Sequence, residues 1–243
     1  MGTLIVTGSS RGIGEAVARL AGARGYAVAI NYSQDREGAE AVAREIGRAV
    51  AIQADVGDEH QVARMFQIAE TELGRVDALV NNAGITGGFA RVEALRAPDV
   101  SEMLRVNVLG TMLCSREAVR RMSSKHGGAG GAIVNISSLA ARTGGSGEWV
   151  HYAASKGAVN TFTIGLAREV ASEGIRVNAV APGLIETGLH AANGAPDRPK
   201  RMAPSIPMER PGRPEEIAEA VLWLLSPAAS YVTGAILEAG GGR

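Results

Sequence analysis

Short apolar runs alternate with amphipathic stretches along almost the whole chain, and this alternation limits most strongly how the sequence can fold. Seven apolar runs have the length of buried strands: 4–7, 28–30, 50–52, 78–80, 132–136, 176–180 and 235–237. Six stretches with helical spacing of apolar residues lie between them: 13–25, 37–47, 60–73, 100–122, 152–172 and 215–225. Strict alternation of this kind predicts an α/β fold, in which helices cover both faces of a parallel sheet.

No shift in composition marks a second domain. The 243 residues, 46% of them apolar, are enough to build one core, and we expect residues 1–243 to form a single dinucleotide-binding and catalytic domain. Residues 183–214 break the rhythm, because they hold six of the nine prolines. A long irregular segment after the carboxyl end of a strand predicts a substrate lid, at about 184–213. A disordered surface loop is the alternative.

Charge and composition exclude several classes of protein. The net charge is +0 and the isoelectric point is about 6.9, so neither nucleic acid nor an anionic membrane is an expected partner. The first residues contain no signal-peptide pattern, and no apolar run is long enough to span a membrane. The single cysteine, Cys114, is expected to be a small buried apolar residue in a reducing, cytoplasmic compartment. One cysteine and four scattered histidines offer no metal site.

A glycine-rich turn joins the first predicted strand to the first helix. Its backbone amides, with the helix N-terminus behind them, would form an anion site for the pyrophosphate of a dinucleotide. The glycine spacing is G-x-x-x-G-x-G rather than G-x-G-x-x-G, so a tight turn without a ligand is the alternative. The candidate cofactor-binding residues in this turn are Gly8, Ser10, Arg11, Gly12, Ile13 and Gly14.

The end of the second predicted strand bears on the choice between NAD and NADP. It reads Asn31-Tyr32-Ser33 and carries no carboxylate that would bind a ribose 2′-hydroxyl, although Asp35 follows shortly. Arg11 lies within reach of the same place and could bind a 2′-phosphate. The sequence therefore favours NADP(H), with NAD(H) possible. A solvated surface charge is the alternative interpretation of Arg11.

Tyr152 and Lys156 stand four residues apart in a predicted helix, which places them one turn apart on the same face. A tyrosine pKa near 10 is too high for easy proton exchange at pH 7, and a nearby ammonium lowers it. The chain has only three lysines among 25 basic residues, so a chance pairing is a poor explanation. The pair predicts a tyrosine that acts as a general acid or base.

Two polar residues occupy places that suggest a role in the same site. Ser138 follows the fifth predicted strand, where a hydroxyl points into the ligand crevice of an open α/β sheet. It could donate a hydrogen bond to a substrate oxygen or simply cap a turn. Asn107 lies between two valines in a predicted helix, where its side chain requires a partner or a water.

Taken in order, these motifs resemble those of the short-chain dehydrogenase/reductase family in its compact single-domain form. The matching positions are residues 8–14, Asn81-Asn-Ala-Gly84, Asn107, Ser138, Tyr152-Ala-Ala-Ser-Lys156 and Pro182-Gly183. The resemblance covers essentially the whole chain. It implies a Rossmann-like doubly wound parallel sheet of seven strands in the order 3-2-1-4-5-6-7. It also implies a homotetramer or homodimer built on the last long helices.

The same resemblance implies a catalytic tetrad. Tyr152 would exchange the proton and Ser138 would hold the carbonyl. Lys156 would bind the nicotinamide ribose and tune Tyr152, while Asn107 would hold a water that links the lysine to solvent. The further cofactor contacts that it implies are Asp55 and Val56 at the adenine, Asn82, Ala83 and Gly84 near the ribose, Pro182, Gly183, Ile185 and Thr187 at the nicotinamide, and Ser33 at a 2′-phosphate.

One departure from the family pattern concerns the substrate end. The gap between Ser138 and Tyr152 is one residue longer than the commonest spacing, and Ser137, a lesser candidate, would lengthen it further. The extra residue falls within 144–149, a loop expected to line the substrate site. The residues expected to line or approach that pocket are Trp149, His151, Leu184, Leu189 and His190.

The predicted function is NAD(P)-dependent hydride transfer between the cofactor and a small-molecule carbonyl or alcohol. A 3-oxoacyl-thioester reductase and a polyol or sugar dehydrogenase are alternatives within the same chemistry. A nucleotide-sensing protein without turnover is the alternative from another class, but such a protein would be expected to lack a member of the tetrad, and this chain has all four.

Overall fold

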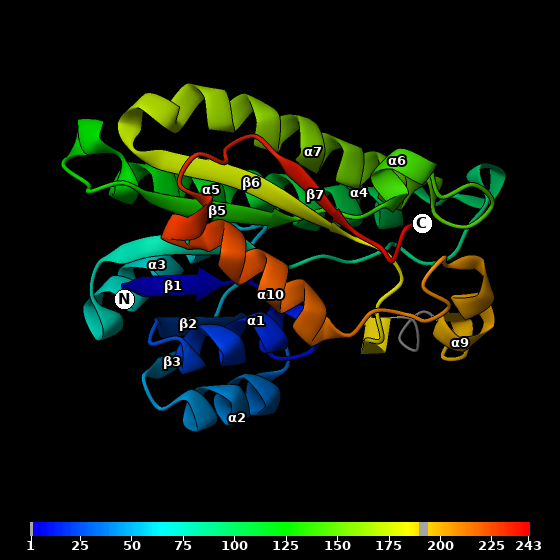
Figure 1. The fold of residues 1–243 in the computed structure, drawn as a ribbon, viewed down its shortest axis with the longest axis horizontal. Helices are drawn as coiled ribbons and strands as arrows, with labels where there is room; N and C mark the ends of the chain where they lie inside the picture. The colour runs from blue at the N-terminus through cyan, green and yellow to red at the C-terminus, as the bar shows by residue number, and fades with distance from the viewer. Residues whose placement is uncertain (1, 190–193) are drawn as a thin grey trace.

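Seven parallel strands form one sheet in the order β3-β2-β1-β4-β5-β6-β7 (Figure 1). We analysed a computed structural model, which describes residues 2–189 and 194–243. The predicted strand number and order are confirmed. The strands are β1 (Thr3–Val6), β2 (Ala27–Tyr32), β3 (Ala49–Gln53), β4 (Val76–Asn81), β5 (Gly131–Ile136), β6 (Ile175–Pro182) and β7 (Ile236–Ala239).

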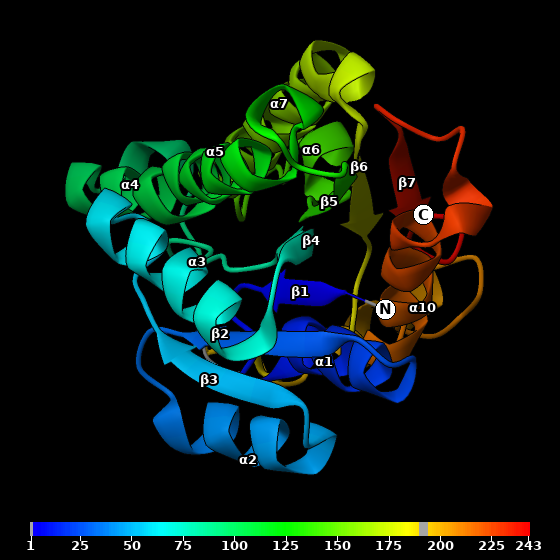
Figure 2. The same cartoon turned by 90° about the vertical axis from the view of Figure 1, so that its left-hand side faces the viewer.

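Helices cover both faces of this sheet (Figure 2). Successive residues of β1 show the two-sided burial, because Leu4 and Val6 pack into one core and Ile5 packs into the other. On the first face lie α1 (Gly12–Ala23), α2 (Arg36–Ile46) and α10 (Pro214–Leu225). On the second face lie α3 (Glu59–Leu73), α5 (Gly110–Met122) and α7 (Val150–Val170). The expected doubly wound arrangement is therefore present.

Local sequence sets where several helices begin and end. The Asp35 side chain accepts a hydrogen bond from the Gly38 amide at the start of α2, and Asp58 caps α3 in the same way. Gly47 follows α2 with a φ of 78°, a conformation that favours glycine. The two aspartates thus mark where α2 and α3 begin, and Gly47 marks where α2 ends.

The expected single helix over 100–122 is wrong in one respect. The structure has α4 (Ala97–Leu104), then a π-helical segment (Arg105–Leu109), then α5. Asn107 lies in the middle of the π segment and bonds through its side chain to the backbone of Ile85. A π turn lets the helix insert a residue and aim one side chain inward, as often happens at functional sites.

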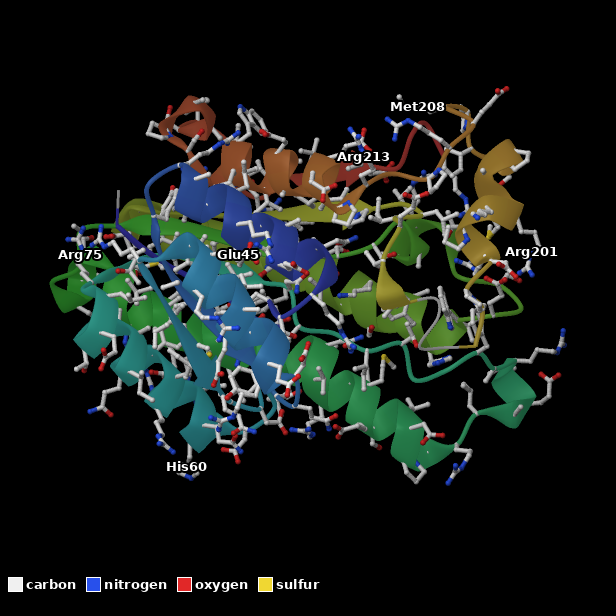
Figure 3. All side chains as sticks on the ribbon, turned by 90° about the horizontal axis from the view of Figure 1, so that it is seen from below. Glu45, His60, Arg75, Arg201, Met208 and Arg213 are labelled. Atoms are coloured by element: carbon white, nitrogen blue, oxygen red, sulfur yellow. The ribbon has the colours of Figure 1, made fainter. Side chains whose placement is uncertain are left out.

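The segment expected to be an irregular lid contains some regular structure. It includes α9 (Arg198–Met202) and a 3₁₀ turn (Ala203–Ser205), and a backbone bridge joins Ile185 to Gly212 near its two ends. Figure 3 shows Arg201 and Met208 of this segment at the end of the molecule away from Arg75. His190 lies outside the described residues. None of the described helices is long and apolar enough to cross a lipid bilayer.

Candidate active site

A cavity of about 1010 Å³ opens at the carboxyl ends of the strands. Side chains from the ends of β1, β2, β4, β5 and β6 and from α7 line it, together with parts of the lid segment. Its volume is at the upper end for small-molecule sites. The expected site residues that line it are Gly8, Ser10, Arg11, Gly12, Ile13, Ser33, Asp55, Val56, Asn82, Ala83, Gly84, Ser138, Tyr152, Lys156, Pro182, Gly183, Ile185 and Thr187.

The glycine turn after β1 is held from both neighbouring strands. The Gly8 amide donates to the Asn31 side chain of β2, and the Asn82 side chain after β4 donates to the carbonyls of Thr7 and Gly8. Gly8 and Gly12 have φ values of 60° and 61°, which favour glycine. The turn is thus a rigid cradle in front of the α1 N-terminus, where an anion would be stabilised.

Gly14 does not line the cavity, because it is buried behind the turn. A Cβ at this position would lie 2.4 Å from the Asn82 Nδ2 atom and 2.5 Å from the Gly8 carbonyl oxygen. Real Cβ atoms essentially never come so close to other heavy atoms. Gly14 therefore serves the site by allowing α1 to pack against the turn rather than by touching a ligand. The close packing of the three segments fits a dinucleotide pyrophosphate site.

The end of β2 and the residues that follow it line the cavity with neutral side chains and one carboxylate. The Asn31 side chain is buried and used within the fold, whereas Ser33 is exposed. Asp35, the carboxylate at this end, also lines the cavity but is engaged in capping α2. The exposed Arg11 side chain has no hydrogen bond or ion pair to another described residue. A 2′-phosphate would find a free guanidinium and a hydroxyl here.

Tyr152, Ser138 and Lys156 converge on the same part of the cavity. The Tyr152 hydroxyl is hydrogen-bonded to the Ser138 side chain. The Lys156 Nζ atom lies 5.7 Å from the centre of the Tyr152 ring and donates to the Ile136 carbonyl at 2.8 Å. Tyr152 and Lys156 are one turn apart on α7, whereas the Ile136 carbonyl and Ser138 lie at and just after the end of β5. The start of α7 packs at this edge of the sheet, and this brings the four residues together.

Burial shifts the pKa values of both groups on α7. It raises the pKa of Tyr152 to about 12, against the opposing effect of the Ser138 hydrogen bond. It lowers the pKa of Lys156 to about 8, because a buried ammonium loses its hydration. In the chain alone the phenol stays protonated at neutral pH, which suits a proton donor to a developing alkoxide.

Asn107 touches the loop after β4 rather than the cavity. Its amide oxygen accepts from the Ile85 amide at 2.8 Å, and its nitrogen donates to the Ile85 carbonyl and to Ser155. A Cβ on Gly84 would lie 3.3 Å from the Asn107 oxygen and 3.5 Å from Lys156 Nζ. Asn107 and Lys156 therefore both border Gly84, and a side chain there would press on the Asn107 oxygen and contact Lys156.

The structure distinguishes between the two serines after β5. The Ser137 hydroxyl donates to the Lys156 carbonyl at 3.3 Å and is buried, although the residue also borders the cavity. Ser138 is the serine that is bonded to Tyr152. The extra residue in the gap between Ser138 and Tyr152 falls near a short helix, α6 (Ala140–Thr143), that the sequence did not predict.

One expected pocket residue is elsewhere. His151 was expected to line or approach the pocket, but it is 6% exposed, does not line the cavity, and packs beneath Gly87. Neighbouring residues on a helix point about 100° apart, so a histidine beside Tyr152 faces the protein interior instead. Trp149, Leu184 and Leu189 do line the cavity, as expected.

Sequence reasoning missed two arginines of the cavity wall. Arg105 forms ion pairs with Asp55, at 2.8 Å, and with Glu102. The carboxylate of Asp55, the expected adenine contact, is therefore paired with an arginine in the structure. Arg198 comes from α9 and contacts Glu148 and Trp149. No sequence spacing identifies either arginine. Arg105 is the first residue of a π turn, and Arg198 contacts residues about 50 positions away in the chain.

Cys114 is fully buried, and burial raises the pKa of its thiol, so it is a buried apolar residue as expected. Among residues 2–189 and 194–243, no group of three potential metal ligands lies close together.

Known proteins resemble this chain over its full length. A family model described as enoyl-(acyl carrier protein) reductase matches residues 8–243. The uncharacterized oxidoreductase YgfF of Escherichia coli is 51% identical over 247 residues, covering 100% of both chains. Glucose 1-dehydrogenase 2 of Bacillus subtilis is 38% identical, covering 99% of this chain and 93% of the relative.

A solved structure agrees with the fold. The crystal structure of a blue fluorescent protein from a metagenomic library, in complex with NADPH, superposes with a TM-score of 0.90 at 34% identity. The match covers 99% of this chain and 97% of that one. Given this sheet, this cavity and these full-length matches, the chain belongs to the short-chain dehydrogenase/reductase family of NAD(P)-dependent oxidoreductases.

Proposed function

We propose that this enzyme reduces the carbonyl group of a small or medium-sized molecule with NADPH, and that Tyr152 donates the proton. In reverse it would act as an alcohol dehydrogenase. The observation that carries the proposal is the Tyr152 hydroxyl bonded to Ser138 inside the cavity, with the Lys156 ammonium one helical turn away.

The roles of the residues follow from their positions. The dinucleotide, when bound, supplies the hydride or accepts it. Ser138 and Tyr152 donate hydrogen bonds to the carbonyl oxygen, and Tyr152 transfers its proton to the alkoxide. In the oxidative direction Tyr152 must lose a proton, and the positive charge of Lys156 favours the phenolate. Asn107 positions the loop that carries Gly84 beside the lysine.

The residues that would hold the cofactor divide by the part of the dinucleotide that each set would meet. The glycine turn would bind the pyrophosphate, and Lys156 and Tyr152 would meet the nicotinamide ribose. NADPH is supported by the unpaired guanidinium of Arg11 and the Ser33 hydroxyl, which line the same cavity, and by the NADPH complex of the similar structure. The remaining contacts are Asp55 and Val56 at the adenine, Asn82, Ala83 and Gly84 along the ribose, and Pro182, Gly183, Ile185 and Thr187 at the nicotinamide.

A panel of aldehydes, ketones and alcohols assayed with both cofactors tests the reaction and the cofactor together. We expect carbonyl reduction to be faster with NADPH than with NADH, and calorimetric titration to show tighter NADPH binding. Arg11→Ala should weaken NADPH binding about tenfold, because a charge-assisted hydrogen bond to phosphate is lost. NADH, without the 2′-phosphate, serves as the internal control. Tighter binding of NADH to the unmodified protein would contradict the cofactor assignment.

Two further substrate classes have some support. A 3-oxoacyl-thioester reductase is supported by the acyl-carrier-protein chemistry in the description of the matching family model. A polyol or sugar dehydrogenase is supported by the similarity to glucose 1-dehydrogenase 2. A nucleotide-sensing protein without turnover is disfavoured, since Asn107, Ser138, Tyr152 and Lys156 are all present. The panel distinguishes the classes if it includes an acyl thioester and a sugar.

We also propose that residues 1–243 act as one dinucleotide-binding and catalytic domain, and that residues 184–213 form its substrate lid. Cavity-lining residues from both ends of the chain support the single domain. Leu184, Leu189 and Arg198 from the segment face the same cavity as Tyr152. A lid that contributes lining residues would exclude water from the reacting groups.

A homotetramer or homodimer is the proposed assembly. A hollow of about 400 Å³ between α5 and α7 is bordered by Met112, Phe162 and Leu166. Leu109, just before α5, and Ile164 of α7 are also exposed. Apolar side chains grouped in this way on a surface favour self-association. Sedimentation velocity should show two or four chains per particle, and Met112→Glu should lower that number. A monomer at micromolar concentration would overturn this proposal.

A further inference from the structure

We infer that Arg198 binds a carboxylate of the substrate, so that the molecules this enzyme prefers are keto acids and the corresponding hydroxy acids. The inference rests on the proposed function, because it names the substrate class of the same site. Four features of Arg198 carry it: its aromatic support, its place relative to Tyr152, its unused donors and the exposure of its present partner.

Two aromatic rings hold the Arg198 guanidinium in place. Its Cζ atom lies 4.6 Å from the centre of the Trp149 ring and 5.9 Å from that of Phe89. The two rings are stacked on each other, with centres 4.5 Å apart and planes 13° from parallel. Stacking favours arginine over lysine and fixes the plane of its donors. The guanidinium is thus already oriented before a ligand arrives.

Arg198 stands close to the acid–base group. Both residues contact Trp149, since its ring lies under the Arg198 guanidinium and also meets the Tyr152 ring edge-on with centres 5.8 Å apart. The Arg198 Cζ atom is therefore no farther from the centre of the Tyr152 ring than the sum of two distances: 4.6 Å from Cζ to the Trp149 ring and 5.8 Å between the two ring centres. Both residues line one cavity. A single small molecule could place its carbonyl at Tyr152 and a carboxylate at Arg198.

The donors of Arg198 are mostly unused. Only 6% of the residue is exposed, yet its guanidinium makes one hydrogen bond to another described residue, from an Nη atom to Glu148 at 2.6 Å. The Nε atom is buried and has no hydrogen-bond partner. A guanidinium has five N–H donors arranged to grip a carboxylate with two of them. Buried donors without partners are costly, so the arrangement favours an anionic ligand.

The present partner of Arg198 can be displaced. The side chain of Glu148 is 41% exposed, whereas that of Arg198 is 7% exposed. The glutamate can turn its carboxylate to water, while the buried arginine, packed over the Trp149 ring and near Phe89, keeps its place. The described residues that line the cavity carry one more cation than acids: the cations are Arg11, Arg105, Lys156, Arg198 and Arg243, and the acids are Asp35, Asp55, Glu102 and Glu148. A substrate carboxylate would restore the charge balance.

A matched set of substrates tests the inference. Linear keto acids of increasing chain length and their methyl esters would be assayed with NADPH. For the best chain length we expect kcat/KM to favour the acid by about tenfold or more, the size of one charge-assisted interaction. Arg198→Gln should reduce the ratio of acid to ester to near one, and Arg198→Lys should restore it only partly. The control is Arg201→Gln on the same helix, which is exposed and should leave the ratio unchanged.

A second variant separates ligand binding from a structural role in closing the lid. Glu148→Gln removes the competing charge, so the ratio of acid to ester should rise about threefold. If the Arg198–Glu148 pair only fastens the lid, both variants should lower acid and ester activity alike, and that result overturns the inference. Circular dichroism of each variant reports whether it is folded.

Binding measurements keep the two proposals distinguishable. Calorimetry would compare acid and ester binding to the unmodified enzyme and to Arg198→Gln in the presence of NADP⁺. A carboxylate preference that needs Arg198, without any turnover, would contradict the proposed reaction and support the inference. Turnover of esters and acids at equal rates, with equal binding, would support the reaction and overturn the inference.

Discussion

Replacing Tyr152 by phenylalanine is expected to lower turnover by about 10²–10⁴-fold, the contribution of a positioned general acid, or by more. The phenol is the group that would protonate the alkoxide, and no other acid among the described residues is bonded to Ser138 in the cavity. The ring remains in the variant, so its edge-on contact with Trp149 is kept. NADPH affinity should therefore stay within about twofold. Single-turnover kinetics and calorimetry measure the two effects separately.

The control for this variant is Tyr231→Phe, because Tyr231 is fully exposed and far from the cavity lining. It loses the same hydroxyl and should keep the normal rate. A Tyr152→Phe enzyme with a near-normal rate would contradict the mechanism. Equal losses of rate and of cofactor affinity would instead indicate that the hydroxyl acts mainly by holding the fold.

The sheet and the position of the site could be predicted because both rest on local patterns. Apolar runs marked the strands, and the carboxyl ends of parallel strands share one edge, which is where Ser138 and the glycine turn lie. The spacing of Tyr152 and Lys156 needs only the pitch of a helix. None of these inferences depends on how distant side chains pack.

The features that were missed depend on such packing. The π turn forms around Asn107, whose partner Ile85 is 22 residues away, and its apolar spacing differs little from that of an α-helix. The position of Arg198 in the cavity wall could not be predicted, because it depends on the packing of the lid segment against Trp149. Gly14 was expected to contact the cofactor. It belongs to the glycine turn, as expected, but it faces Asn82 and does not line the cavity, and only the fold shows this.

The role of Gly14 leads to the second large effect. Gly14→Ala would place a methyl group 2.4 Å from Asn82 Nδ2, 2.5 Å from the Gly8 oxygen and 2.9 Å from the Ser9 Cα atom. Two of these atoms belong to backbone, so they cannot give way without moving the turn. The Asn82 bonds to the Thr7 and Gly8 carbonyls, each 2.9 Å long, would be lost. These bonds hold the glycine turn to the end of β4.

We therefore expect Gly14→Ala to weaken NADPH binding on the order of 100-fold, because the loss of two oriented hydrogen bonds and the displaced cradle together amount to about 3 kcal/mol. The free energy of unfolding should fall by about 1–3 kcal/mol from overpacking. Calorimetry and urea denaturation measure these quantities. Gly157→Ala on α7 is the matched control, since a Cβ there meets nothing within 4 Å and the residue lines neither the cavity nor the hollow between α5 and α7, and it should leave both unchanged or raise stability slightly. Normal NADPH affinity in a folded Gly14→Ala protein would refute the packing role and leave the glycine turn without its proposed support.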